Sequence, residues 1–231
     1  PSKAVQRGSF GACLMNDKVL VRQCLETLQS DKIITSLKCR IGLGRKLNYD
    51  FFESFINEVL KSGIKIVYVH ARNAILEGIS PKANRTIPPL NYDFVNKIKF
   101  DYPNVKFIIN GGIDSMDKAT TLANQFDGVM LGRLIQSNPF LLKNVDYNFY
   151  NGKKIIDIDE TIINQYFDYI KNKVETDSIF RLLSPLLNIF FGVPNSKNFK
   201  KQINESMKER KLILIEKLFL KFVKEKNYLL N

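Results

Sequence analysis

IVYVHARNAILEGISPKANRTIPPL, residues 66 to 90, is the stretch of sequence that decides the fold. It begins with an apolar run that predicts a buried strand, and His70, the only histidine of the chain, stands at the end of that run. The glycine and prolines that follow predict a long loop, which contains Arg72, Lys82 and Arg85. A cationic loop at the end of a buried strand favours an anionic ligand. The alternative is a solvated surface loop beside an ordinary core histidine.

Strands and helices alternate on both sides of this stretch. The sequence predicts strands over residues 33–41, 64–69, 105–109 and 128–131. Helices are predicted after Asp17, from Asn48 to Gly63, around residues 94–98, and from Asp114 or Ser115. This α/β alternation implies a parallel sheet with right-handed crossovers, which is either open or closed into a barrel.

The strand signal disappears after a turn-rich segment at residues 144–152. Beyond it, apolar residues recur at helical spacing over residues 162–174, 179–191 and 212–223. The sequence therefore predicts two domains, an α/β domain over residues 1–150 and an all-α helical bundle over residues 151–231.

Composition limits the functions that the chain can have. A chain of 231 residues with 45% apolar content can bury a core, and a net charge of +12 that extends over both domains favours nucleic acid as the partner. Cys13, Cys24 and Cys39 have neither CxxC nor zinc-finger spacing, which predicts reduced thiols in a cytoplasmic protein and no metal site. We also expect no membrane span, because no apolar run approaches about 20 residues.

Groups suited to an anionic cofactor stand near the ends of all four predicted strands. They are Lys38, His70, the run Asn110, Gly111 and Gly112, and the pair Gly132 and Arg133. In a parallel barrel, ligands bind at the C-terminal ends of the strands, and the last loops typically hold phosphate. Glycines let backbone N–H groups approach phosphate closely, so the two glycine segments predict a phosphate site. The alternative is that the glycines only form turns and the cations are solvated.

The segments that carry these groups resemble those of a known family. They are SLKCRIG (36–42), VHARNAILEGISPKANRTIPPLNYDFV (69–95), INGGI (109–113) and DGVMLGR (127–133). Together they are similar to segments of the tRNA-dihydrouridine synthases, specifically the A-type subfamily that acts on uridines 20 and 20a of the D-loop. The resemblance covers residues 1 to 205 and includes RLLSPLLNIFFGVP (181–194). It implies the C-terminal half of a TIM (β/α)8 barrel, its last four strand–helix units, followed by a helical tRNA-binding domain.

The resemblance also implies an activity. The enzymes of this family are oxidoreductases in which NADPH reduces bound FMN, the flavin passes a hydride to C6 of a flipped uracil, and a cysteine protonates C5. Lys38 matches the lysine beside the N1/O2 edge of the flavin, and His70 matches a histidine of the same site. The remaining FMN residues, which match the two phosphate loops, are Asn110, Gly111, Gly112, Gly132 and Arg133.

Four further positions match the tRNA contacts of the family. Lys82 and Arg85 match contacts in the loop after the second strand. Lys197 and Lys200 stand where the subfamily usually has arginines, so they keep the charge but lose the bidentate guanidinium.

The catalytic cysteine of the family is expected directly before Pro1. We expect Cys13, Cys24 and Cys39 to be core thiols, because Cys13 lies in an ordinary packing segment, Cys24 lies on an apolar helix face and Cys39 alternates away from Lys38. No catalytic residue is therefore assigned within the chain.

A chain of this extent is expected to be an inactive fragment that self-associates through open sheet edges. Two alternatives stay open: another FMN barrel that acts on a small pyrimidine, and a non-enzymatic RNA-binding fragment.

Overall fold

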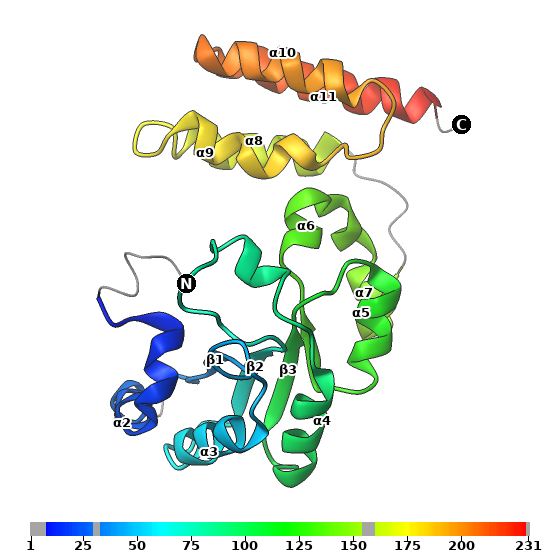
Figure 1. Cartoon of the computed structure of the whole chain (residues 1–231). Coiled ribbons are helices and arrows are strands. Elements are labelled where there is room, and N and C mark those ends of the chain that lie inside the picture. Colours follow the sequence, from blue (N-terminus) through cyan, green and yellow to red (C-terminus); the bar gives the residue numbers. More distant parts are fainter. Residues whose placement is uncertain (1–7, 30–32, 154–159, 230–231) are drawn as a thin grey trace. The chain divides into compact units, whose positions relative to one another are not determined.

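The computed structural model describes residues 8–29, 33–153 and 160–229 (Figure 1). The chain forms two compact units, Pro1–Leu131 and Gly132–Asn231. We expected the division near residue 150, whereas the units divide at Leu131. Residues after the last strand belong to the second unit, since Phe140 packs against the hydrophobic core of the C-terminal helices.

The first unit contains a parallel sheet of four strands, β1 (Leu37–Arg40), β2 (Ile66–His70), β3 (Lys106–Asn110) and β4 (Gly128–Met130). The strands stand side by side in sequence order, β1-β2-β3-β4. This is the order of consecutive strands in a singly wound barrel, whereas a doubly wound sheet reverses its order at one point. β1 is shorter than predicted, because Ile33 and Ile34 are exposed and lie outside the strand.

The two faces of the sheet differ in chemistry. Residues that are partners in a parallel register point to the same face, and successive residues of a strand point to opposite faces. One face is apolar and buried, and consists of Cys39, Val67, Val69, Phe107 and Ile109. The other face, which we call the polar face, carries Lys38, Arg40, Tyr68, His70 and Asn110.

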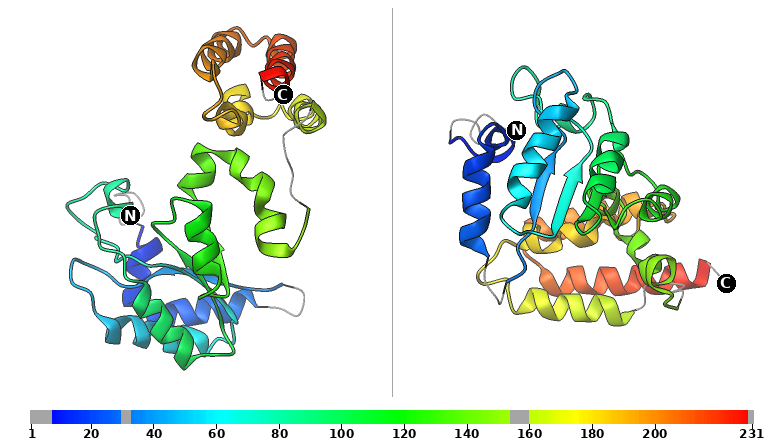
Figure 2. Two further views of the ribbon diagram at one scale, coloured as in Figure 1. Left: turned by 90° about the vertical axis from the view of Figure 1, so that its right-hand side faces the viewer. Right: turned by 90° about the horizontal axis from the view of Figure 1, so that it is seen from below.

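Helices of the first unit cover the apolar face and can be followed in Figure 2. After the 3-10 helix η1 (Gly11–Asn16) they are α2 (Lys18–Leu28), α3 (Tyr49–Leu60), α4 (Tyr92–Asp101) and α5 (Met116–Ala123). Each begins at a residue whose side chain accepts a hydrogen bond from the first turn, namely Asp17, Asn48, Asn91 and Ser115. The predicted apolar side of α3 is confirmed, with Phe52, Phe55, Ile56 and Val59 buried.

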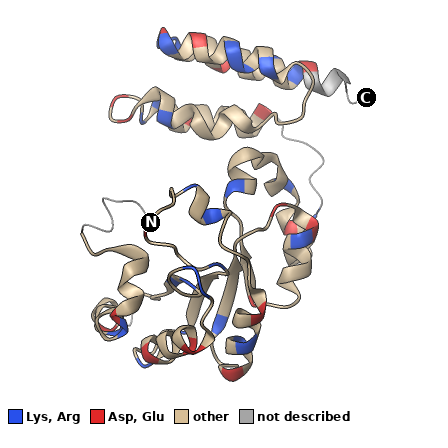
Figure 3. Cartoon of the chain, in the orientation of Figure 1, with Lys and Arg blue, Asp and Glu red and all other residues tan. Residues whose placement is uncertain are grey.

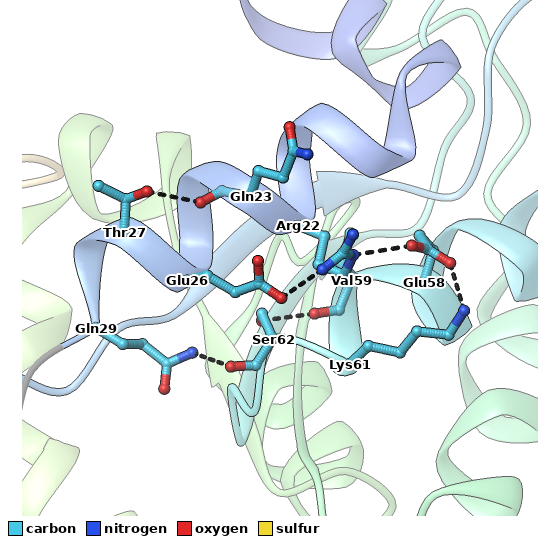
Figure 4. Close-up of polar contacts among 9 residues, drawn as sticks. All are labelled: Arg22, Gln23, Glu26, Thr27, Gln29, Glu58, Val59, Lys61 and Ser62. Atoms are coloured by element: carbon cyan, nitrogen blue, oxygen red, sulfur yellow. Dashed lines mark hydrogen bonds and ion pairs between the residues drawn. The ribbon is translucent and has the colours of Figure 1, made fainter.

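α2 is held to α3 largely by polar contacts (Figure 4). Arg22 lies between Glu26, at 2.6 Å, and Glu58, at 2.9 Å, and Lys61 contacts the other oxygen of Glu58 at 2.6 Å. Lys61 and Arg22 lower the pKa of Glu58 by hydrogen bonding to its ionised form. Leu25 is the buried residue of α2, so much of its apolar side remains exposed.

The three thiols differ from one another. Cys39 is buried as expected, and burial raises its pKa to about 12. The expectation of core thiols is wrong for the other two, because Cys24 is exposed and Cys13 is half-buried. Helical periodicity identified an apolar side on α2, but in this structure only Val21 and Leu25 of that helix pack against the core, and Leu20 and Leu28 are exposed.

The described secondary-structure elements of the second unit are all helices. Its elements are α6 (Arg133–Ser137), η3 (Pro139–Asn144), α7 (Val145–Tyr150), α8 (Glu160–Lys171), α9 (Ile179–Leu183), η4 (Ser184–Asn188), α10 (Ser196–Lys208) and α11 (Leu212–Leu229). The single helix predicted over 179–191 is divided into α9 and η4, with Pro185 in the first turn of η4. α10 was not predicted, because only Phe199, Ile203 and Met207 interrupt its polar sequence.

Aromatic rings form the core of the second unit. Phe199 stacks on Phe222 with ring centroids 4.5 Å apart and meets the edge of Phe219 at 4.8 Å. Phe190 contacts the same group, with its ring 4.8 Å from that of Phe222. Such pairs stabilise a core beyond their buried area.

Among the described residues, no helix has the length and apolar character that a membrane crossing requires. The same residues contain no group of three or more His, Cys, Asp or Glu side chains placed to hold a metal ion.

The apolar face predicts a large effect of Phe107 on stability. Phe107→Ala should lower the free energy of unfolding of the first unit by about 3 to 5 kcal/mol, because this fully buried ring leaves a cavity. Phe100→Ala is the control, since Phe100 is 86% exposed and its loss should cost less than about 0.5 kcal/mol. Urea denaturation followed by circular dichroism measures both, and equal losses would contradict the assigned face.

Candidate functional site

The candidate site lies on the polar face, at the C-terminal ends of the strands. Arg40, His70 and Asn110 are register partners on β1, β2 and β3, so they form one row across the sheet. The amide of Asn110 continues the row to β4 by donating to the carbonyl of Met130 at 2.7 Å. The prediction that His70 and Asn110 end neighbouring strands is confirmed.

Lys38 lies on the same face, two residues before Arg40. Its side chain is exposed, yet the protein atoms around it lower the pKa of its ammonium, and Arg40 lowers that pKa further. Both effects disfavour the charged form, so a negatively charged ligand beside Lys38 would relieve them.

The glycine loop (residues 110–112) begins with the last residue of β3 and packs against His70. Gly111 and Gly112 have φ values of +107° and +64°, which disfavour other residues. A Cβ atom on Gly111 would also lie 2.7 Å from Nε2 of His70, and one on Gly112 would overlap a methyl group of Leu90. Both positions therefore require glycine.

Backbone donors of this loop are available to a ligand. Within the part of the chain that the structure describes, the N–H groups of Gly112 and Ile113 donate to no protein acceptor. Backbone N–H groups withdrawn from water nearly always have an acceptor in native proteins, and both of these residues are partly buried. The nearest acid in sequence, Asp114, is 81% exposed and pairs with Lys118 at 3.7 Å. The loop thus suits an anionic group such as a phosphate.

The cationic loop (residues 71–90) is tied down by two buried asparagines. Asn84 accepts from the N–H of Ile75 at 2.9 Å and donates to the carbonyl of the same residue at 2.7 Å. Asn73 donates to the carbonyl of Lys46 at 2.7 Å. Both amides are buried and hydrogen-bonded to the backbone, so the loop is ordered by specific contacts, which favours the functional interpretation over a merely solvated loop.

Arg40 fastens the cationic loop to the sheet. Its Nη1 donates to the carbonyls of Asn73, at 3.3 Å, and Asn84, at 3.2 Å. Burial, together with the nearby charges of Arg72 and Arg85, lowers the pKa of Arg40 to about 10, so three guanidinium groups act on one another here. Sequence reasoning did not assign Arg40 to the site. Because residues two apart on a strand point to the same face, the position of Arg40 two residues after Lys38 could have indicated it.

A second arginine connects the start of the cationic loop to its end. Arg72 donates through Nη1 to the carbonyls of Thr86, at 3.2 Å, and Pro88.

Figure 3 colours the described Lys and Arg residues of the chain, including those around η2 (Ala83–Arg85). Lys82 and Arg85, the predicted tRNA contacts, are both exposed there.

The other predicted site residues lie in the second unit. Gly132 and Arg133 are exposed at the start of α6, and their part in a phosphate site stays a prediction. On α10, Lys197 is exposed, whereas Lys200 is half-buried and donates to the side chain of Asn188 at 2.9 Å.

Comparison with known proteins places the chain beside enzymes of one kind. The family model described as dihydrouridine synthase matches residues 1–226. The tRNA-dihydrouridine(20/20a) synthase of Shewanella oneidensis is 36% identical over 208 residues, which are 89% of this chain and 62% of that protein.

Two further relatives carry the same name. That of Synechocystis is 36% identical over the same shares of both chains, and that of Escherichia coli K12 is 35% identical over 89% of this chain and 61% of its own. The chain spans about three fifths of the length of these curated relatives.

The glycine loop generates a prediction about Gly111. Gly111→Ala should destabilise the first unit by about 1 to 3 kcal/mol from backbone strain alone, and should displace His70. Gly128→Ala in β4 is the control, because its φ is not in the left-handed region and its Cβ would meet Ile108 at an ordinary 3.4 Å. Thermal unfolding of both variants measures the difference. Equal stability would mean that Gly111 is not required at this position.

Proposed function

The chain belongs to the dihydrouridine synthase family, and from that premise we propose that the protein reduces uridine to 5,6-dihydrouridine in tRNA, with FMN as cofactor and NADPH as reductant. The names of its relatives lead us to propose uridines 20 and 20a as the targets. We also propose that the four parallel strands correspond to the last four strand–helix units of the barrel of this family.

The observation that carries the proposal is the glycine loop. The N–H groups of Gly112 and Ile113 lack protein acceptors within the described residues, and side chains of His70 and Leu90 leave no room for a Cβ atom on either glycine. These are the properties of a loop that approaches a phosphate through its backbone. We assign the FMN phosphate to residues 110–112. The family resemblance implies that Gly132 and Arg133 also contact the phosphate, and that part stays a prediction.

The polar face suits the ring of the cofactor. When bound, FMN supplies hydride transfer between a nicotinamide and the pyrimidine ring of the substrate. Lys38 would stabilise negative charge on the reduced ring, which agrees with its exposed position and the lowered pKa of its ammonium. His70 supports the site by packing against Gly111. Cys39 is on the opposite face, so we assign it no part in proton transfer.

The tRNA contacts are proposed on both units. Lys82 and Arg85 are exposed on a loop that Arg40 and two buried asparagines hold in place. Lys197 and Lys200 present charge on α10, which has no acidic residue in its first turn. A net charge of +12 supports the attraction of a polyanion to either unit.

The function itself is tested by NADPH-dependent formation of dihydrouridine in unmodified tRNA. Lys38→Met should lower the rate about 10²-fold, the usual scale for one electrostatic group, whereas Lys65→Met, at an exposed position next to β2, should leave it unchanged. Because the pKa of Lys38 is lowered, its charge is lost at a lower pH than that of an ordinary lysine, so the rate should fall as pH rises. Equal turnover of free uridine and tRNA would point to a small-pyrimidine reductase instead.

The tRNA contacts are tested by the salt dependence of binding. Lys82→Ala, Arg85→Ala, Lys197→Ala and Lys200→Ala should each weaken tRNA binding and lower the slope of log K against log salt by about one unit. Flavin content should not change. Lys106→Ala is the matched control, since Lys106 is exposed at the opposite end of β3 from the glycine loop. If all variants keep the slope of the parent, the positive charge is only solvated surface.

A further inference from the structure

Two side chains outside the glycine loop hold its carbonyl groups. The hydroxyl of Tyr92, at the start of α4, donates to the carbonyl of Gly111 at 2.5 Å. The ammonium of Lys118, in the first turns of α5, donates to the carbonyl of Gly112 at 2.6 Å. Neither residue was singled out from the sequence, and the family resemblance assigned no role to them.

These contacts fix the direction of the free N–H groups. In a trans peptide the C=O and the N–H point in opposite directions, and the described chain has no cis peptide bond. The peptide that joins Gly111 to Gly112 carries the carbonyl bound by Tyr92 and the N–H of Gly112. The next peptide carries the carbonyl bound by Lys118 and the N–H of Ile113. Each anchor therefore turns one N–H group away from itself.

The loop needs such anchors because glycine has the largest conformational freedom of all residues. Both anchors start from rigid positions. Asn91 caps α4 by accepting from the N–H of Phe94 at 3.0 Å, and its own N–H donates to the carbonyl of Ala71 beside β2 at 2.9 Å. Ser115 caps α5 in the same way, at 3.1 Å from the N–H of Lys118.

Protonation and charge agree with this arrangement. Burial raises the pKa of Tyr92, so its hydroxyl keeps the proton that it donates. Lys118 is nearer to the carbonyl of Gly112 than to Asp114, its 3.7 Å ion-pair partner. A cation at this position also favours a nearby dianion.

We propose that Tyr92 and Lys118 are positioning residues of the phosphate site: they hold two consecutive peptide groups of the glycine loop so that the N–H groups of Gly112 and Ile113 face the phosphate of the flavin. This inference rests on the flavin site proposed above. It assigns to Tyr92 and Lys118 a role in recognising the phosphate, separate from any role in holding the flavin ring.

The test compares FMN with riboflavin, which has the same ring but no phosphate. The protein is stripped of flavin and titrated with each compound while flavin fluorescence is followed. Tyr92→Phe removes only the hydroxyl, and Lys118→Met removes the charge while keeping the length. Each should raise the Kd for FMN about tenfold, the effect of one lost hydrogen bond, and leave the Kd for riboflavin unchanged.

Controls and contrary outcomes separate this inference from the proposed function. Tyr102→Phe and Lys106→Met repeat the same chemical changes away from the glycine loop and should alter neither Kd. If Tyr92→Phe and Lys118→Met weaken FMN and riboflavin equally, or weaken neither, the positioning role is wrong although the flavin site stands. If the parent protein binds FMN no better than riboflavin, the phosphate site fails, and with it both proposals.

Discussion

The register of the parallel sheet is the constraint on which the rest of the first unit depends. It places Arg40, His70 and Asn110 in one row on the polar face, while Cys39, Val69 and Ile109 lie in the adjacent row on the buried face. A shift of one residue in any strand would exchange the two faces, burying charge and exposing the core. Burial of the apolar face therefore fixes the position of every polar group in the site.

Gathering cations on this face works against stability. Arg40 is close enough to Arg72 and Arg85 for both to lower its pKa, and burial lowers it more than either. Backbone carbonyls compensate, since Arg40 donates to Asn73 and Asn84 while Arg72 donates to Thr86 and Pro88. Carbonyl oxygens satisfy the donors without neutralising the charge. The face consequently remains attractive to an anion.

Features that depend on residues close together in the sequence could be predicted, whereas features that depend on contacts between distant residues could not. The cap at Asp17, the start of α3 at Asn48 and the buried side of α3 depend on neighbouring residues, and they were predicted correctly. For α5 the sequence left Asp114 and Ser115 open, and the structure has Ser115 as the cap. α10 was missed because its few apolar residues acquire meaning only from the aromatic core that they join.

The exposure of Cys24 was likewise unpredictable from periodicity, since the pattern of a helix does not show what covers it. In the site, strand ends and glycines were visible in the sequence. The bonds of Arg40, Tyr92 and Lys118 to distant carbonyls join residues that are far apart in sequence, and they appear only in the fold.

The end of the cationic loop and the start of α4 connect the cationic loop to the glycine loop. The carbonyl of Pro88 accepts from Arg72, Leu90 packs against Gly112, and Tyr92 donates to the carbonyl of Gly111. Residues 88–92 therefore contact both Arg72, at the start of the loop that carries the proposed tRNA contacts, and the loop proposed to hold the flavin phosphate. Because interiors are closely packed, a displacement of this segment would move both loops together. The stretch of sequence that decides the fold thus ends in residues that contact both proposed binding loops.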